Sequence, residues 1–245
     1  ELSNNKLTVK ASIGIAVSDN AKIKADSLFL QADMAMYDAK KKGRDTYTLF
    51  TDALGLAAQH RLQVEKDLPS AMSENQFVLH YQPKVSCITN EVIGFEALLR
   101  WEHPEYGLIP PNDFIPIIEE SHLIIDLGEW VLVEAVRQLA QWRQQGKKLR
   151  PIAVNISGFH LHDDSLLIFL KKLIHQYNIS IDLIEVEITE GVLTGHTEES
   201  IRAMGELKSH DVKLSIDDFG TGYSSLSYLK KFPIDALKID RSFVN

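Results

Sequence analysis

Two adjacent carboxylates, Asp217 and Asp218, directly follow the apolar stretch from Val212 to Ile216 and precede a loop rich in glycine and serine. Buried strands are usually continuous apolar runs, so acids at the end of a strand are costly unless a partner binds them. A divalent cation is a suitable partner because hard cations prefer oxygen ligands. Asp and Gly also favour helix N-caps and turns. The pair therefore indicates either a metal site or a turn.

Further polar residues recur near the C-terminal ends of the strands expected on the basis of the sequence. Because side chains alternate across a strand, each of these polar residues can be assigned to one face of its strand. In a parallel barrel the strand ends converge on one rim, where active sites lie. The pattern therefore predicts one shared site. Its members, one from each successive strand, are Glu96, Asn155, Glu187, Asp217 and Lys238.

The residue types in this set suit a hard divalent cation. Its carboxylates and its one amide form an all-oxygen shell that fits Mg²⁺ or Mn²⁺ and is poor for zinc. Asp218 could hold a second ion a few ångströms away, an arrangement used in phosphoester hydrolysis. Lys238 and Arg100 supply positive charge for a phosphate or for orienting an attacking water. Together these residues predict a two-metal phosphodiesterase site.

Each residue also has an ordinary structural explanation. Lys238 alone would more often be solvated or salt-bridged, Asn155 a turn residue, and Glu187 a surface acid on an edge strand. Their ordered recurrence favours the shared site. Two weaker signals are interpreted as structural: the His160-Leu-His162 segment as a surface loop and Gly220-Thr-Gly222 as a turn.

The elements that must position these residues alternate between strand and helix from Phe77 onward. This alternation indicates a parallel sheet, either a barrel or a doubly wound sheet. We expect strands over residues 77–85, 92–99, 152–156, 183–188, 212–216 and 236–239. We expect helices over residues 113–121, 127–145, 165–177, 198–210 and 224–231.

The first part of the chain has a different organisation. Residues 1–50 predict an α+β fragment, with a strand over 7–17, a helix from Asp26 that ends near Gly43, and a short strand over 46–50. Residues 51–76 predict a connecting helix that Pro69 would kink or end. Residues 77–245 then form the main domain.

The overall composition is that of a globular protein. The 245 residues are 44% hydrophobic and 24% charged, and the net charge of -8 argues against nucleic acid as a general partner. Cys87 is the only cysteine, which excludes an intrachain disulfide and suits a reducing cytosol. No apolar run approaches the length of a membrane span. We therefore expect a cytoplasmic chain, with a membrane anchor only in a part outside this sequence.

Residues from about 60 to 245 resemble the EAL domain, a family of phosphodiesterases specific for cyclic di-GMP. The motifs that carry the resemblance, in chain order, are Tyr81-Gln-Pro83, Phe95-Glu-Ala-Leu-Leu-Arg-Trp101, Val154-Asn-Ile-Ser157, Glu187-Ile-Thr-Glu190, Asp217-Asp-Phe-Gly-Thr-Gly-Tyr-Ser-Ser225 and Leu237-Lys-Ile-Asp-Arg-Ser-Phe243. The resemblance implies a (β/α)₈ TIM-like barrel, and hydrolysis of cyclic di-GMP to linear pGpG by metal-activated water. It also implies a homodimer formed through this domain.

The resemblance also implies a role for each matching residue. Glu96, Asn155, Glu187 and Asp217 would bind the first Mg²⁺ or Mn²⁺ ion, with Asp217 and Asp218 serving a second one. Lys238 would position the attacking water. Substrate contacts are implied for Gln82, Leu98 and Arg100, beside Asp218. Glu190 would steady the loop that follows Asp218, which in this family couples dimerisation to metal binding.

Residues 1–50 resemble the C-terminal end of a GGDEF, or diguanylate cyclase, domain. The carriers are Ser12-Ile-Gly-Ile-Ala16, Ala32-Asp-Met-Ala-Met-Tyr-Asp-Ala-Lys40 and Gly43-Arg-Asp45. The nucleotide-binding signature of that domain is absent from the sequence. We therefore expect no cyclase activity from these residues.

One departure from the EAL pattern concerns the C-terminal side. The family pattern continues with a further glutamate, thought to assist metal binding, and a glutamine, and neither occurs here. The expected strands from Phe77 number six, whereas a closed barrel needs eight. We therefore expect a barrel that lacks its last strands, in an excerpt of a tandem GGDEF–EAL protein that is inactive by itself.

Two other functions are compatible with the motifs. A degenerate EAL domain could sense cyclic di-GMP without cleaving it, although a sensor has no need of the complete metal shell found here. A purely structural or interaction domain is the third alternative, and it has the least support from the motifs.

Overall fold

The computed structural model describes residues 10–18, 23–119, 123–195, 197–220 and 229–244. Contacts within the chain divide it into two compact units, residues 1–67 and 68–245, which are described separately. Within the described ranges, no helix is both long enough and apolar enough to cross a membrane.

The N-terminal unit contains a small parallel sheet and the helix that connects its strands. Strand β1 (Ile13–Ile15) pairs in parallel with β2 (Tyr47–Leu49), and α1 (Ala25–Lys41) lies between them in the sequence. A parallel pair needs such a crossover connection. Gly43 has φ 105°, a conformation that favours glycine after a helix, so the predicted helix end is confirmed. The part of the predicted first strand before Lys10 lies outside the described residues.

Helix α2 (Asp52–Ser73) follows β2 and continues through Pro69. Of the two predicted effects of Pro69, a kink or an end of the helix, the end is therefore wrong. A proline inside a helix removes one backbone hydrogen bond. Leu68 and Ala71, on either side of it in the sequence, are buried, so burial of apolar surface offsets that loss.

The second unit is built on one sheet with the strand order β3-β4-β6-β7-β8-β9, and β5 pairs with β4. Strands β4, β6, β7, β8 and β9 are parallel, whereas β3 and β5 are antiparallel to β4. The strands span Phe77–Val85 (β3), Val92–His103 (β4), Gly107–Ile109 (β5), Ile152–Asn155 (β6), Ile184–Thr189 (β7), Lys213–Phe219 (β8) and Ala236–Ile239 (β9). The predicted alternation of strands and helices is confirmed.

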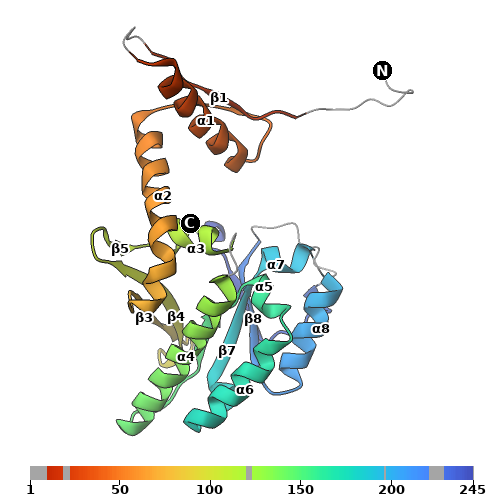
Figure 1. Cartoon of the computed structure of the whole chain (residues 1–245). Coiled ribbons are helices and arrows are strands. Elements are labelled where there is room, and N and C mark those ends of the chain that lie inside the picture. Colours follow the sequence, from red (N-terminus) through yellow and green to blue (C-terminus); the bar gives the residue numbers. More distant parts are fainter. Residues whose placement is uncertain (1–9, 19–22, 120–122, 196, 221–228, 245) are drawn as a thin grey trace, which may run out of the picture. The chain divides into compact units, whose positions relative to one another are not determined.

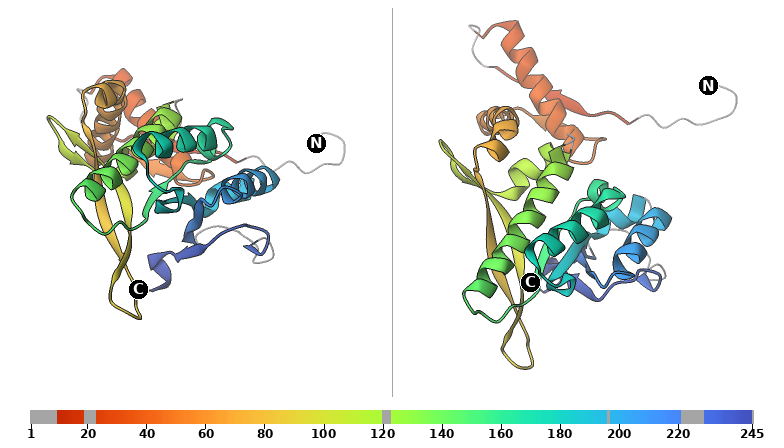
Figure 2. Two further views of the ribbon diagram at one scale, coloured as in Figure 1. Left: turned by 90° about the horizontal axis from the view of Figure 1, so that it is seen from below. Right: turned by 60° about the horizontal axis from the view of Figure 1, so that its bottom comes forward.

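The helices of this unit lie along one face of the sheet, as Figures 1 and 2 show for α4, α6 and α8. They span Pro111–Glu119 (α3), Leu123–Gln144 (α4), Gly158–Leu161 (α5), Ser165–Tyr177 (α6), Glu190–Gly195 (α7) and Thr197–Lys208 (α8), with short 3₁₀ turns at Ile181–Leu183 (η1) and Arg241–Phe243 (η2). The sequence did not predict the short helices α5 and α7. Most of the helix expected over 224–231 lies outside the described residues.

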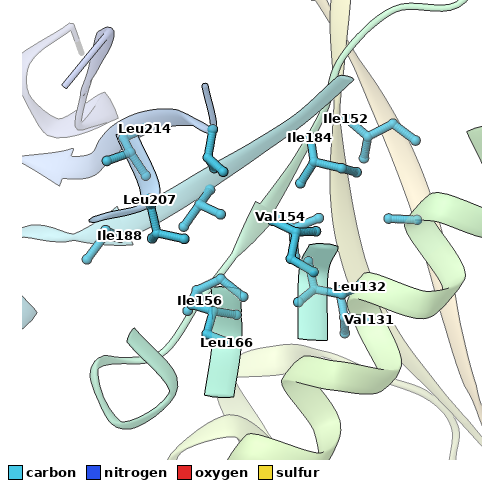
Figure 3. Close-up of a cluster of buried hydrophobic side chains, with 14 of the residues drawn as sticks. Val131, Leu132, Ile152, Val154, Ile156, Leu166, Ile184, Ile188, Leu207 and Leu214 are labelled. Carbon is cyan, nitrogen blue, oxygen red and sulfur yellow. The ribbon is translucent and has the colours of Figure 1, made fainter. Parts of the chain in front are cut away.

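Aliphatic side chains fill the space between the sheet and these helices. Figure 3 shows Val154 of β6 close to Leu132 and Val131 of α4, and Ile152 and Ile184 belong to the same buried cluster. Side chains alternate across a strand, so the residues between these apolar ones project from the opposite face. That opposite face carries the polar residues of the site.

An aromatic cluster fixes the first two strands of the sheet. The ring centroids of Phe77 and Trp101 are 5.6 Å apart, and each lies 5.6 Å from the ring of Phe114 on α3. The Trp101 indole Nε1 donates a hydrogen bond of 2.8 Å to Gln76 Oε1. Because tilted aromatic contacts add to the burial energy, this cluster holds β3 firmly against β4.

The described strands form an open sheet. In the part of the chain that the structure describes, β9 pairs with β8 alone, and Ile239 on β9 is exposed.

Helix α6 allows a direct test of the core. Replacing Leu170, which is fully buried, with alanine should lower the free energy of unfolding by about 2–5 kcal/mol, because it removes apolar contacts and leaves a cavity. The same change at the exposed Ile168 should alter it by less than about 0.5 kcal/mol. Urea denaturation of both variants measures the difference, and similar losses would contradict this assignment of the core.

Candidate metal centre

Three carboxylates from the parallel strands β4, β7 and β8 converge, with Glu96 midway along β4 and with Glu187 and Asp217 near the C-terminal ends of β7 and β8. Glu96, Glu187 and Asp217 each place an oxygen within 4.8 Å of the others. The pairing explains this convergence. Glu187 on β7 lies opposite Ser215 on β8. Asp217 is two residues further along β8 on the same face, so its carboxylate lies near that of Glu187. The site predicted from the strand faces therefore contains a real cluster of acids.

The Lys238 ammonium group lies at the centre of this cluster. Its Nζ donates hydrogen bonds to Glu96 Oε2 (3.0 Å), Glu187 Oε2 (2.8 Å) and Asp217 Oδ2 (2.7 Å). The cluster thus already binds a cation, through one oxygen of each carboxylate. Oxygen ligands in this arrangement match the preference of Mg²⁺ or Mn²⁺, so these residues fit the expected ion.

Burial has opposite effects on the two kinds of charged group. Glu187 is fully buried, and this burial raises the pKa of its carboxyl group, although the hydrogen bond from Lys238 partly opposes the rise. Burial lowers the pKa of Lys238, but its hydrogen bonds with Asp217 and Glu187 outweigh that effect and leave the pKa raised. Lys238 is therefore charged and firmly held between the acids.

A second lysine, which sequence reasoning missed, contacts the same cluster. Lys84 on β3 donates hydrogen bonds to Glu185 Oε2 (3.0 Å) and to Glu187 Oε1 (3.1 Å). The signal was present in the sequence, because Lys84 alternates with Gln82 on one face of β3. Glu187 therefore has a lysine partner on each of its two oxygens.

The predicted ligand Asn155 lies next to Glu96. Its Nδ2 donates a hydrogen bond of 3.3 Å to Glu96 Oε1, and its backbone pairs in register with Glu187. The amide nitrogen contacts the acid, so the amide oxygen is available on the other branch of the side chain. Asn155 thus lies at the edge of the cluster.

Asp218 owes its position to an irregularity in β8. The register advances from Ile216 to Phe219 on β8 while it advances only from Leu237 to Ile239 on β9, which inserts one extra residue. Such bulges redirect side chains and occur next to active sites. Asp218 itself has φ 52°, in the left-handed region, and its side chain is exposed rather than packed against the helices.

The electrostatic surroundings of Asp218 are acidic. Its backbone N–H donates a hydrogen bond of 2.9 Å to Asp217 Oδ1. Partial burial raises the pKa of the Asp218 carboxyl, and the nearby carboxylates of Asp217 and Asp240 raise it further. Asp240 is another acid that sequence reasoning did not assign to the site. Asp218 is near the cluster but is not one of the three carboxylates that converge.

A cavity of about 460 Å³ lies beside the cluster. Among the predicted substrate residues, Leu98 and Arg100 line it, and Asn155 connects it to the acids. Apolar side chains from α3 and α4 form much of its wall, including Ile115 and Leu127. Gln82 is exposed on β3, opposite Glu96 in register, and is not part of this wall.

Glu190 is buried at the start of α7, and its Oε2 accepts a hydrogen bond of 2.7 Å from the Gly220 backbone N–H. Gly220 has φ 103°, and a Cβ atom there would lie 2.4 Å from the Phe243 ring. Only glycine fits this position. Glu190 therefore fixes the chain where the loop after Asp218 begins, and residues 221–228 lie outside the described ranges.

The interpretation of His160-Leu-His162 as a surface loop is wrong. His160 is fully buried in the short helix α5, and Gly128 on α4 leaves room for its ring, because a Cβ there would lie 2.4 Å from His160 Nδ1. The ring nitrogen Nε2 of His162 forms a hydrogen bond of 3.0 Å with Ser200 Oγ. In the Gly220-Thr-Gly222 segment only Gly220 is described.

The described residues form an α/β domain built on an open sheet, with a cluster of carboxylates that surrounds a lysine ammonium group. The chain belongs to the EAL-domain family, whose EAL domain matches residues 65–245. Residues 1–46 match the diguanylate cyclase, GGDEF domain. The EAL family is a family of hydrolases with a TIM-barrel type of fold, so both resemblances suggested by the motifs are confirmed.

Known relatives share this architecture. MucR of Pseudomonas aeruginosa, a bifunctional diguanylate cyclase/cyclic di-GMP phosphodiesterase, is 41% identical over 245 residues, which are 100% of this chain and 36% of MucR. PdeR of Escherichia coli, a cyclic di-GMP phosphodiesterase, is 42% identical over 233 residues, 95% of this chain and 35% of PdeR. The chain thus spans about a third of the length of these relatives.

Solved structures show the same fold. The phosphodiesterase PaMucR in complex with c-di-GMP has a TM-score of 0.71 and 43% identity, with 75% of this chain and 74% of that chain covered. The EAL enzyme Bd1971, in a form with cAMP and cyclic di-GMP bound, has a TM-score of 0.70 and 31% identity, with 91% and 59% covered.

The Lys238 ammonium group should stabilise the protein in the absence of divalent cations. Lys238→Met leaves three converging carboxylates without their shared counter-ion, so the free energy of unfolding in chelator should fall by about 1–3 kcal/mol. Lys208→Met, which removes an exposed ion pair with Asp235, should cost less than about 1 kcal/mol. Chemical denaturation compares the two variants, and equal losses would show that the central position of Lys238 is unimportant.

Proposed function

We propose that this protein hydrolyses cyclic di-GMP to linear pGpG in a metal-dependent reaction. The observation that carries the proposal is the cation-binding cluster of Glu96, Glu187 and Asp217 around the Lys238 ammonium group, in a domain of the EAL family. Relatives named as cyclic di-GMP phosphodiesterases support the choice of substrate.

We assign the binding of a first Mg²⁺ or Mn²⁺ ion to Asn155 and the three converging carboxylates. Asp218, beside Asp217, would contribute to a second ion. When bound, such cations stabilise negative charge on a phosphate and lower the pKa of a bound water. The single oxygens that now accept hydrogen bonds from Lys238 are the atoms that would hold the first ion, because they already surround a positive charge.

Lys238 would then serve the reaction as a hydrogen-bond donor. With an ion held by the acids, the Lys238 ammonium group would be able to donate to the attacking water or to a phosphate oxygen. The water oxygen forms a bond to phosphorus, the bond from phosphorus to the ribose 3′ oxygen breaks, and that oxygen gains a proton. Opening one of the two phosphodiester bonds in this way gives linear pGpG.

The cavity beside the cluster suits part of the dinucleotide. Its apolar wall can pack against a purine base, while the Arg100 guanidinium group offers positive charge to a phosphate at the mouth. Leu98 lies on the same wall, and Gln82 extends from the neighbouring strand. The homodimer expected from the resemblance, and a role for Glu190 within it, stay predictions.

Hydrolysis can be measured with the full-length protein as its gene encodes it, by separating cyclic di-GMP from pGpG chromatographically. In Mg²⁺ or Mn²⁺ the wild-type protein should produce pGpG, and Glu96→Gln should lower kcat by at least about 100-fold, because it removes a ligand of the cation. Glu91→Gln is the matched control, since this glutamate is exposed in the turn before β4. It should leave the rate unchanged.

Other results would favour a different function. Tight binding of cyclic di-GMP without product would indicate a sensor, and neither binding nor product would indicate an interaction domain. Residues 1–245 by themselves should show little activity, because the described strands form an open sheet. Rapid turnover by these residues alone would contradict the need for a closed barrel.

Metal binding should weaken as the pH falls. The pKa values of the Glu187 and Asp218 carboxyls are both raised, chiefly by burial, so protons compete with the cation at a higher pH than for ordinary acids. The increase in Tm produced by Mn²⁺ should therefore be large near pH 8 and shrink toward about pH 5. Thermal unfolding with and without Mn²⁺ measures this.

In the metal-free protein, the Glu187 and Asp218 carboxyls should contribute more to folding stability at low pH than at high pH. A raised carboxyl pKa means that the folded state binds the proton more tightly than the unfolded state, so this contribution to stability is lost as the pH rises. A gain in Tm from Mn²⁺ that is equal at all pH values would show that neither carboxyl contacts the ion.

A further inference from the structure

Lys84 belongs to β3, the antiparallel first strand of the sheet, and is only partly exposed to solvent. Its neighbour Tyr81 packs on Trp142 of α4, so Tyr81 faces the helices and the alternating Gln82 and Lys84 face the interior of the barrel. Lys84 therefore approaches the acids from the side opposite the helix-packed core.

The two oxygens of Glu187 have different partners. Oε1 accepts a hydrogen bond of 3.1 Å from Lys84, and Oε2 accepts one of 2.8 Å from Lys238. A cation held between the acids would compete with Lys238 for Oε2, and the contact of Lys84 with Oε1 would not be involved. Lys84 can thus hold the carboxylate in place in both states.

We propose that Lys84 is a positioning residue for the metal centre: it binds Glu187 Oε1 and thereby directs Oε2 toward the cation. This inference rests on the proposed function. Groups that orient metal ligands through a hydrogen bond commonly change metal affinity by 10–100-fold.

The strand pairing places Lys84 beside β4. Lys84 lies opposite Gly94 in register, and a Cβ atom at Gly94 would lie 3.1 Å from the Pro151 carbonyl oxygen. The same atom would be in ordinary van der Waals contact with Lys84 Cε, at 3.7 Å, so the tight contact at Gly94 is with Pro151 rather than with the lysine. Glu185, the second partner of Lys84, lies two residues before Glu187 on the same face of β7 and keeps the ammonium group at the level of the cluster.

Whether metal affinity rises or falls when Lys84 is removed distinguishes a positioning role from a purely electrostatic one. Lys84 carries a positive charge near the proposed ion, so a purely Coulombic role would weaken metal binding, and removing the lysine would strengthen it. A positioning role predicts the reverse, because Glu187 loses the bond that orients it.

The test measures Mn²⁺ affinity by isothermal titration calorimetry, in the full-length protein and without nucleotide. Lys84→Met should weaken Mn²⁺ binding by about 10–100-fold, and Lys84→Arg, which keeps a donor, should recover part of the loss. Lys172→Met, the same change on the exposed surface of α6, should have no effect. Mn²⁺ affinity that is unchanged or tighter in Lys84→Met would overturn the proposal.

Lys84→Gln provides a second comparison, which applies if Lys84→Met does not fold. It removes the charge of Lys84 and shortens the side chain, so Glu187 loses the bond that orients it and Mn²⁺ binding should weaken by about tenfold or more. Mn²⁺ affinity that is unchanged or tighter in this variant would overturn the proposal. Wild-type protein that binds Mn²⁺ but hydrolyses no cyclic di-GMP contradicts the proposed function alone, whereas wild-type protein that binds no Mn²⁺ overturns both.

Discussion

The site depends on one interaction, the binding of a single ammonium group by three carboxylates that approach one another on the rim of the sheet. Glu187 is fully buried, and without a cation its charge would oppose folding. Lys238 provides that cation at 2.7–3.0 Å from all three acids. The lysine therefore allows the fold to assemble a strongly acidic site before any metal ion binds.

The rest of the domain keeps the acids close together despite their repulsion. Aliphatic residues between the helices and one face of the sheet fix the strands, and the parallel pairing sets which residues meet on the other face. Rigid strands hold functional groups more precisely than loops do. Asp218 is the exception, because the position of its side chain depends on the bulge in β8 and on its positive φ. The nearby Gly220 is held by a hydrogen bond to the buried Glu190.

The sequence was informative wherever a regular periodicity held. Alternation on the strands was sufficient to group Glu96, Glu187 and Asp217, and Gly43 marked the end of α1. The sequence could not predict the register between strands, and this register decides atomic contacts such as the one between Lys84 and Glu187. His160 was misplaced because a four-residue helix has too little periodicity to be recognised, and only the packing against Gly128 reveals its burial. The bulge at Asp218 was likewise invisible, since it depends on the partner strand.

The two lysines around Glu187 have different relations to a metal ion. Lys238 occupies the position between the acids, so in the proposed function it would compete with the ion and would have to move when the ion binds. Lys84 contacts the opposite oxygen and need not move. A site with only the first lysine would release Glu187 each time the metal ion arrives, and a buried carboxylate free to rotate would have to be ordered again. With both lysines present, the proposed exchange of ammonium for metal would disturb one oxygen of Glu187 and leave the other bound, which would lower the entropic cost of ordering the ligand.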